Sequence, residues 1–314
     1  MERSKLNRKI LPLIVLFLAV IPLLRIGDFV LRLLLTILIF VIMGESWNII
    51  SGYTGYFSFG QTFFFGIGAY VTALLARNYS VSPFLSAPLC GLLAMVLAMG
   101  FGIITLRLRG AYFTLSTLVI MLLARAIVEN ADKITGGGKG IALPFPGIDY
   151  SVFLIVIYYT YFTLSLLSVC LAYRIANSKY GLAIKCIRED EEAAEVLGID
   201  TVKCKMFAYV FSALFPAMVG AVWSYDMGYI WPSTAFDINV EAMTVTSVIF
   251  GGIGTIAGPI IGSLCLVLLR EVLRLTLTGF GSIYLITYGI ILIFAVIYCP
   301  DGIGKKVIAA ITKR

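Results

Sequence analysis

Long apolar runs separated by short polar interruptions make up most of the chain. Several of these runs approach the roughly 20 residues that a helix needs to cross the hydrocarbon core of a bilayer. They are continuous rather than alternating, which favours helices over the strands of a barrel. We therefore predict an all-α polytopic transmembrane bundle of about ten spans. The predicted spans cover residues 10–24, 33–50, 83–106, 112–128, 152–173, 206–225 and 283–299, with two more between 240 and 278. A further span, the third in the chain, continues from the glycine- and aromatic-rich stretch 51–70 and ends near residue 76.

Two glycine-rich strings interrupt this pattern at comparable places in the two halves of the chain. One covers residues 52–68, and the other, residues 251–262, divides an apolar run that is too long for a single helix. Paired interruptions are typical of the inverted repeats of transporters, in which broken helices line the substrate path. The alternative is that the glycines only allow close packing, because glycine is common in membrane helices.

Composition and charge indicate a single membrane-embedded unit. The chain of 314 residues is 60% hydrophobic and 13% charged, and its mean hydropathy is +1.00. We see no separate soluble domain, so we predict one transmembrane domain over residues 1–314. The Lys and Arg residues behind the net charge of +7 cluster at the N-terminus, at 107–109, at 174–205 and at the C-terminus. With ten spans these segments share one side, and the positive-inside rule places them and both termini in the cytoplasm.

The longest charged stretch, residues 177–205, is predicted to be a cytoplasmic loop. Its middle, Arg188 to Leu197, has the pattern of a short helix, with Gly198 in position for a C-cap. Carboxylates favoured by the helix dipole fill its predicted first turn: Glu189, Asp190, Glu191 and Glu192. Apolar residues share one side: Ile184, Ile187, Ala194 and Leu197. Such a stripe could seat in a groove on a soluble partner. The alternative is a solvated loop that contacts nothing.

Residue types needed for catalysis or metal binding are scarce. The chain has no histidine, which removes the commonest metal ligand and general base. Its six cysteines form no CxxC pair and no disulfide framework. The string GGGKG at residues 136–140 lacks the spacing of a nucleotide-binding loop. We therefore predict no enzymatic activity, no metal and no cofactor, and any ATP would have to be used by another chain.

Polar groups inside the apolar runs are the candidates for lining a pathway. A charge at membrane depth costs roughly 2.5–3.5 kcal/mol on insertion scales, so such a residue usually faces a cavity or the protein interior. The candidates are Glu45, Ser58, Gln61, Thr62, Gly251 and Gly252. For Glu45, buried pairing is the alternative, and for the glycines it is close helix packing.

Two further charged groups lie within predicted spans. Arg125 and Glu129 are four residues apart and could pair on one helix face. The cluster of Arg270, Glu271 and Arg274 lies near the predicted outer surface. We attribute that cluster to pairing or to snorkelling rather than to a pathway.

Five strings follow one another along nearly the whole chain. They are SGYTGYFSFGQTFFFGIGAY at 51–70, LRLRGAYFTLSTL at 106–118, TGGGKGI at 135–141, GLAIKCIREDEEAAEVLGI at 181–199 and FGGIGTIAGPIIGS at 250–263. Each is weak alone, but together they resemble the permease subunits of bacterial ATP-binding cassette importers for branched-chain amino acids, and the M-type permease in particular. Mild departures from the family at Gly138, Lys185 and Cys186 bear on the choice of substrate rather than on the class.

The resemblance implies a permease that imports leucine, isoleucine and valine across the bacterial cytoplasmic membrane. It also implies three kinds of partner: a second homologous permease subunit, two cytoplasmic ATPase subunits and an extracytoplasmic substrate-binding protein. The chain would contact membrane lipid and no nucleic acid. In this family the charged loop contacts the ATPase. Carried over to this sequence, the contact comprises Ala183, Ile187, Arg188, Glu189, Asp190, Glu191, Ala193, Ala194 and Gly198.

Three alternatives stay open on the sequence alone. Related permeases handle urea, short amides, nucleosides or sugars. A stand-alone secondary transporter or passive channel would need no ATPase contact. A membrane-embedded enzyme acting on lipid-linked substrates would need a cluster of Asp, Glu or His at one membrane face, and the sequence has no such cluster outside the charged loop.

Overall fold

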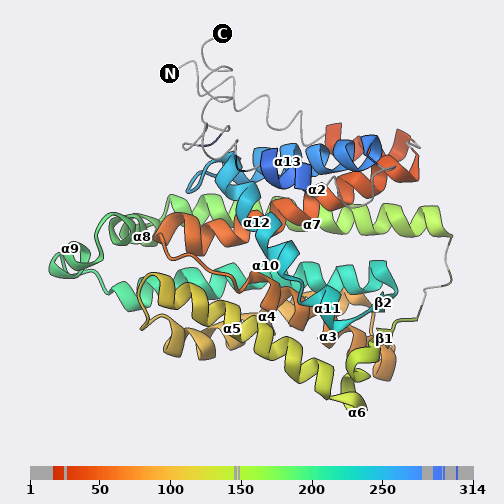
Figure 1. The fold of residues 1–314 in the computed structure, drawn as a ribbon, viewed down its shortest axis with the longest axis horizontal. Coiled ribbons are helices and arrows are strands. Elements are labelled where there is room, and N and C mark those ends of the chain that lie inside the picture. The colour runs from red at the N-terminus through yellow and green to blue at the C-terminus, as the bar shows by residue number, and fades with distance from the viewer. Residues whose placement is uncertain are drawn as a thin grey trace, which may run out of the picture.

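Long apolar helices lie side by side along the long axis of the molecule (Figure 1). The computed structural model describes residues 17–24, 27–144, 147, 149–277, 286–291, 293 and 302. In chain order the elements are η1 Ile21–Leu24, α2 Asp28–Trp47, the π-helical turn η2 Asn48–Gly52, α3 Gln61–Tyr79, α4 Pro83–Thr105, α5 Ala111–Asn130, α6 Asp132–Thr135, η3 Gly137–Lys139, β1 Ile141–Ala142, α7 Tyr150–Ala176, α8 Lys179–Glu189, α9 Glu191–Val196, α10 Thr201–Met227, β2 Tyr229–Ile230, α11 Pro232–Ala235, α12 Ile238–Gly251 and α13 Ala257–Thr276.

Five of the described helices are long and apolar enough to cross a membrane. They are α2 together with η2, α4, α5, α7 and α10, and each lies on a predicted span. The predicted all-α membrane bundle is therefore confirmed, whereas the predicted count of ten spans is not. The first and last predicted spans, 10–24 and 283–299, lie partly outside the described residues.

Three other predicted spans are helices of a different kind. α3 begins with Gln61 and Thr62 and has Arg77 and Asn78 near its end, and its residues are on average less apolar than those of α2. α12 has 14 residues, which gives a length of about 21 Å against a hydrocarbon core of about 30 Å. α13 is amphipathic: Leu266 and Val267 are buried, whereas Arg270 and Arg274 are exposed. These helices fill the bundle without matching the length and composition of a simple span.

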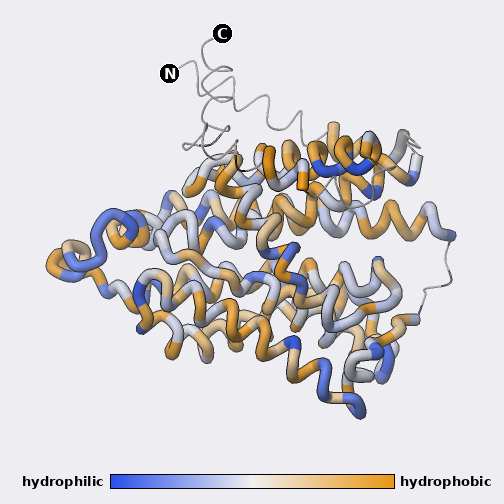
Figure 2. Tube along the Cα trace, in the orientation of Figure 1, coloured by the Kyte–Doolittle hydropathy of each residue, from blue (hydrophilic) through white to orange (hydrophobic). Residues whose placement is uncertain are grey.

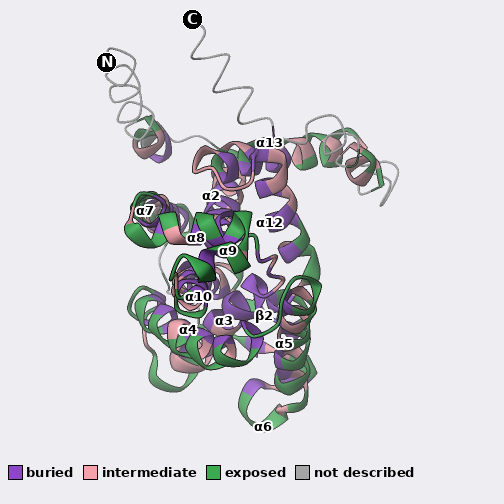
Figure 3. Cartoon of the chain, turned by 90° about the vertical axis from the view of Figure 1, so that its left-hand side faces the viewer, coloured by how far each residue is buried: buried purple, intermediate pink, exposed green. Residues whose placement is uncertain are grey.

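The central helix of the bundle is α10, which packs along α3 and α4 and also contacts α2 and α7 (Figure 3). Its buried positions include the small residues Ala213, Ala217 and Ala221. α3 approaches so closely that a Cβ placed on Gly68 would lie 2.0 Å from the carbonyl oxygen of Ala217. Small residues of this kind let two membrane helices bring their backbones into contact. α3 is thus fixed to the core through α10.

Polar elements gather at the two ends of the bundle. α8 and α9 project at one end and carry a run of hydrophilic residues (Figure 2). At the opposite end lie α6, α11 and the antiparallel ribbon of β1 and β2, in which Ile141 pairs with Ile230. We call these the α9 end and the ribbon end.

Candidate functional site

The charged segment, residues 177–205, forms two short helices, so the predicted single helix from Arg188 to Leu197 is wrong. α8 ends at Glu189, and the extended backbone of Asp190, with φ of −159°, breaks the chain between α8 and α9. The Asp190 carboxylate then caps α9 by accepting from the backbone N–H groups of Glu192 and Ala193, at 2.9 and 3.0 Å. Aspartate is a preferred N-cap residue, so this turn has a local cause.

This break redistributes the four carboxylates that the sequence placed in one helical turn. Glu189 is the last residue of α8, Asp190 is the cap, and only Glu191 and Glu192 lie in the first turn of α9. The predicted C-cap is confirmed: Gly198 has φ of +82° directly after α9, a conformation that favours glycine.

The apolar stripe of the charged segment faces the bundle rather than a soluble partner. Ile184, Ile187 and Ala194 are buried in the main core of the chain. Leu197, the fourth predicted member, is instead 77% exposed. The stripe therefore attaches the segment to the membrane helices, and the opposite face of α9 remains open. That open face comprises Glu192, Ala193, Glu195, Val196 and Leu197.

A buried ion pair fixes α9 to the start of α10. The Lys205 ammonium donates to the Glu191 carboxylate at 2.6 Å and to the Tyr56 hydroxyl at 3.2 Å. The Tyr56 hydroxyl in turn donates to the other oxygen of Glu191, and Lys205 Nζ lies 4.5 Å from the centroid of the Tyr56 ring. We call these three residues the Glu191 lock. It joins α9 and α10 to the segment after η2, where Tyr56 lies 135 residues before Glu191.

Arg188 reaches from α8 into the two glycine-rich strings. Its Nη1 donates to the carbonyl oxygen of Gly52 at 2.7 Å. Its stem lies over Gly55, and its guanidinium lies over Gly254, where an added Cβ would be 2.4 Å from Nη1. Gly254 has φ of +76°, a backbone conformation that favours glycine. The charged segment is thus in direct contact with both helix breaks.

The two glycine-rich strings are breaks between helices, and Asn48 ties them together. Residues 55–60 are unwound between η2 and α3, and residues 252–256 separate α12 from α13. The Asn48 side chain donates to the carbonyl oxygen of Thr255 at 2.9 Å and accepts from the N–H of Gly254 at 2.8 Å. One amide therefore satisfies two backbone groups that the second break leaves without a helical partner.

Replacing Asn48 by Ala is expected to lower the free energy of unfolding by about 1–3 kcal/mol, because the variant leaves these backbone groups of Gly254 and Thr255 without partners. Thermal unfolding of the purified chain in detergent measures the change. Asn130→Ala is the matched control, since that amide makes one exposed bond to the carbonyl oxygen of Ala126. Equal melting of the two variants would show that Asn48 does not hold the breaks together.

The predicted pathway residues near the first break are all fully buried. Both carboxylate oxygens of Glu45 and both amide atoms of Gln61 have no hydrogen-bond partner within the described part of the chain. Ser58 accepts from the backbone N–H of Gly60 at 3.2 Å, so it shapes the unwound stretch. Unpartnered buried polar groups are costly, and their presence here marks a polar interior in an otherwise apolar bundle.

Glu241 is a buried carboxylate that the sequence analysis missed. Its Oε2 accepts from the backbone N–H and the hydroxyl of Thr62, both at 2.7 Å, at the N-terminus of α3. Its Oε1 has no partner among the described residues. A lone acidic residue in an apolar run is the same signal that drew attention to Glu45, and it could have identified Glu241. The structure therefore extends the polar interior from α2 to α12.

The glycines at the second break lie at a tight helix contact. A Cβ on Gly251 would lie 1.8 Å from the carbonyl oxygen of Gly258, so this position brings α12 and α13 together. Gly252 has φ of +120° and ends α12. Both are buried, which fits close packing and does not by itself place them on a pathway.

Two pairs of the other charged groups inside apolar runs form ion pairs, and Arg270 does not join them. Arg125 and Glu129 pair at 2.8 Å within α5, as predicted. Arg274 pairs with Glu271 at 2.5 Å on α13. Arg270 has no carboxylate partner in the part of the chain that the structure describes, and its Nη1 lies 3.3 Å from the sulfur of Met243.

Broken helices, unpartnered polar groups between them and a polar segment anchored to both breaks define a multi-pass membrane protein of the transport class. A family model for the permease component of branched-chain amino acid transport systems matches residues 29–296, and the chain belongs to this family. The predicted resemblance is thereby confirmed.

Curated relatives agree with this assignment. The chain is 28% identical over 292 residues to the high-affinity branched-chain amino acid transport system permease protein LivM of Salmonella typhimurium, an alignment that covers 85% of this chain and 68% of the relative. LivM of Escherichia coli gives the same values. A probable branched-chain amino acid transport permease protein LivH of Methanocaldococcus jannaschii is 25% identical over 266 residues, with coverage of 78% and 82%. No solved structure matches the chain.

Proposed function

We propose that the chain is the permease subunit of an ATP-binding cassette importer that carries leucine, isoleucine and valine across the bacterial cytoplasmic membrane. The family and the names of the relatives support this substrate class. The observation that carries the proposal is the placement of the charged segment. One face of α9 is open at the end of the bundle, while Arg188 and the Glu191 lock connect the segment to both helix breaks and to α10.

The partners follow from what this chain lacks. The sequence has no nucleotide-binding loop, so two separate cytoplasmic ATPase subunits would supply the energy. A second homologous permease would complete the pathway, and an extracytoplasmic protein would deliver the substrate. In this arrangement the α9 end faces the cytoplasm, in keeping with its basic residues, and the ribbon end faces outward.

The residues proposed for the ATPase contact divide into two groups by their position. Ile187 and Ala194 are buried and Glu191 is largely enclosed, so these three hold the segment on the bundle. The outward group, Glu189, Asp190, Ala193 and Gly198, is exposed, and Ala183 is half-buried. Arg188 spans the two groups. We propose that the ATPase pushes on the exposed group and that the enclosed group passes the movement on as a rigid body.

The polar interior is the proposed route of the substrate through the membrane. Glu45, Gln61 and Glu241 offer carboxylate and amide atoms that have no partner within the described residues. Because the unwound stretch at 55–60 adjoins these groups and also contacts Arg188, a movement of the charged segment would reach the interior directly. Ser58 and Thr62, and Gly251 and Gly252 at the second break, belong to the same route.

Uptake of labelled amino acids by cells that carry all the subunits tests this function. Cells that carry all the subunits should take up labelled leucine, isoleucine and valine, and deletion of this chain should abolish that uptake. Relatives named for import of fructose and of autoinducer 2 make those solutes the matched alternatives. Uptake of another solute in place of the amino acids would overturn the substrate assignment. Uptake that persists without ATPase subunits would instead indicate a stand-alone transporter.

Replacing Leu197 by Asp is expected to abolish co-purification of the ATPase subunits, because it puts a charge on the exposed apolar residue that closes the open face of α9. The measurement is pull-down of the ATPase with the tagged chain. Ile134→Asp is the matched control, since Ile134 is similarly exposed but belongs to α6 at the ribbon end. Normal recovery of ATPase with Leu197→Asp would place the contact elsewhere.

A further inference from the structure

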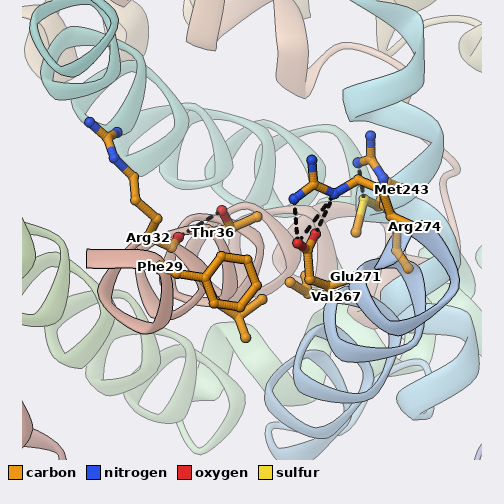
Figure 4. Close-up of a pocket in the computed structure, with 9 residues that line it drawn as sticks. Phe29, Arg32, Thr36, Met243, Val267, Glu271 and Arg274 are labelled. Atoms are coloured by element: carbon orange, nitrogen blue, oxygen red, sulfur yellow. Dashed lines mark hydrogen bonds and ion pairs between the residues drawn. The ribbon is translucent and has the colours of Figure 1, made fainter. Parts of the chain in front are cut away.

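A pocket with both apolar and charged walls lies between α2, α12 and α13 (Figure 4). Its volume is about 330 Å³, within the range of small-molecule sites. Phe29, Leu33, Met243 and Val267 line its apolar side. Its α2 wall lies near the ribbon end, because neighbouring Arg32 pairs with Asp226 at the end of α10. In the proposed orientation this is the outer end of the bundle.

The charged wall of this pocket has one cation in excess. Arg32 is held by Asp226 at 2.9 Å and by the Tyr150 hydroxyl, and Arg274 is paired with Glu271. Figure 4 shows Glu271 and Arg274 joined across from Arg32 and Phe29. Arg270 lines the same wall and has no carboxylate partner among the described residues; its Nη1 lies 3.3 Å from the Met243 sulfur, and its charge acts on the nearby Tyr288 hydroxyl. An incoming oxyanion would supply the partner that Arg270 lacks.

We propose that this pocket binds a free amino acid with an aliphatic side chain as a zwitterion. The substrate carboxylate pairs with Arg270, the ammonium group approaches Glu271, and the side chain packs on Phe29, Leu33 and Val267. Glu271 can accept further bonds, because a carboxylate has about four acceptor sites and Arg274 uses only part of them. The identity of the ligand rests on the proposed function. The site itself lies apart from the polar interior at the helix breaks, so it would hold the substrate before it enters the route.

A phosphate of a lipid headgroup shares the oxyanion chemistry but not the rest of the pocket. The phosphate of a headgroup would pair with Arg270. The apolar wall of the pocket and the carboxylate of Glu271 instead match a small molecule that has an aliphatic side chain and an ammonium group as well. The two ligands therefore differ in what each wall contributes, and analogues that lack one group of the zwitterion separate them.

The test is equilibrium binding of tritiated leucine to the full chain, co-purified with its partner subunits and placed in nanodiscs of phosphatidylcholine without the substrate-binding protein. Arg270→Gln should weaken leucine binding by about tenfold or more, and Arg270→Lys should weaken it less. Arg77→Gln is the matched control, because Arg77 is an exposed arginine in the last turn of α3, outside the pocket. On the wild-type protein, both leucinol and isocaproate should compete poorly, since each lacks one charged group.

Three results would overturn the proposal. One is leucine binding by Arg270→Gln that equals the wild type. Another is leucinol that competes as well as leucine. The third is phosphatidylglycerol that is retained by the wild type and lost in Arg270→Gln while leucine binding stays unchanged, which would assign Arg270 to lipid. These failures leave wild-type uptake of amino acids intact, whereas failure of the proposed function removes that uptake altogether, so the two are distinguishable.

Discussion

Replacing Lys205 by Met is expected to lower the free energy of unfolding by about 3 kcal/mol, because the variant leaves an enclosed carboxylate without its cation. The Lys205 side chain is 3% exposed and that of Glu191 is 15% exposed, so water cannot replace the lost partner. Tyr56 would keep a single hydrogen bond to Glu191 and lose its contact with the ammonium. Thermal unfolding of the full chain in detergent should show a lower Tm, and α9 should become accessible to proteolysis.

A second lysine in the same helix provides the control for this variant. Lys203 pairs with Asp200 at 2.8 Å, but its side chain is 84% exposed. Lys203→Met should leave the Tm unchanged, since exposed ion pairs contribute little. The double variant Glu191→Gln with Lys205→Met should recover part of the loss, because it removes both charges. If Lys205→Met and Lys203→Met melt alike, the Glu191 lock has no stabilising role.

The Glu191 lock also predicts how stability depends on pH. Burial by itself raises the pKa of Glu191, but hydrogen bonds from Lys205 and Tyr56 outweigh it and hold the pKa below the ordinary value of 4.5. A carboxyl with a lowered folded pKa contributes stability above its unfolded pKa and loses it as the pH falls through the folded one. The Tm difference between wild type and Glu191→Gln should therefore be largest near about pH 7 and shrink below about pH 4.5.

The long helices could be predicted from the sequence because their signal is local. An apolar run closed by charged or turn-forming residues fixes α4, α5, α7 and α10 to within a few residues of the predicted spans. The same signal fails for α12 and α13, because the bundle buries short or amphipathic helices that a composition rule cannot tell from spans. The N-cap at Asp190 could also have been predicted from the sequence, since aspartate before two glutamates is a common start of a helix.

Most of the candidate site could not be predicted, because its contacts join residues that are distant in the sequence. Glu189 and Glu191 are two residues apart and look alike in the charged run. One is exposed, and the other pairs with Lys205 and with Tyr56, 135 residues away. No periodicity in the sequence distinguishes these two carboxylates. Charge reversal at both would therefore mix a surface change with the loss of the lock, and only the structure shows how to separate them.

Arg188 is the residue whose loss should uncouple the charged segment from the membrane helices. Arg188→Ala removes the hydrogen bond to Gly52 and the contacts over Gly55 and Gly254, but it leaves the open face of α9 and the Glu191 lock in place. Uptake of leucine by the whole system should fall by about tenfold or more, in line with a coupling free energy of 1–3 kcal/mol. Co-purification of the ATPase subunits should stay normal, because their proposed contact is unchanged.

Variants on the same helix separate coupling from folding. Lys185→Ala is the matched control: Lys185 lies one turn earlier on α8, is exposed, and within the described residues makes only a long bond of 3.4 Å to the carbonyl oxygen of Ala176. It should transport normally. Arg188→Lys should fall between wild type and Arg188→Ala, because lysine keeps the charge but lacks the planar guanidinium that covers the backbone of Gly254.

Two readouts decide whether Arg188 transmits movement or only stabilises the fold. In a coupling role, Arg188→Ala lowers uptake while the ATPase activity of the assembled importer persists, so more ATP is hydrolysed for each leucine carried. In a purely structural role, the Tm, ATPase recovery and uptake fall together. Normal uptake with Arg188→Ala would show that the contact between α8 and the two helix breaks carries no movement. The path from the ATPase would then have to run through the Glu191 lock and α10 instead.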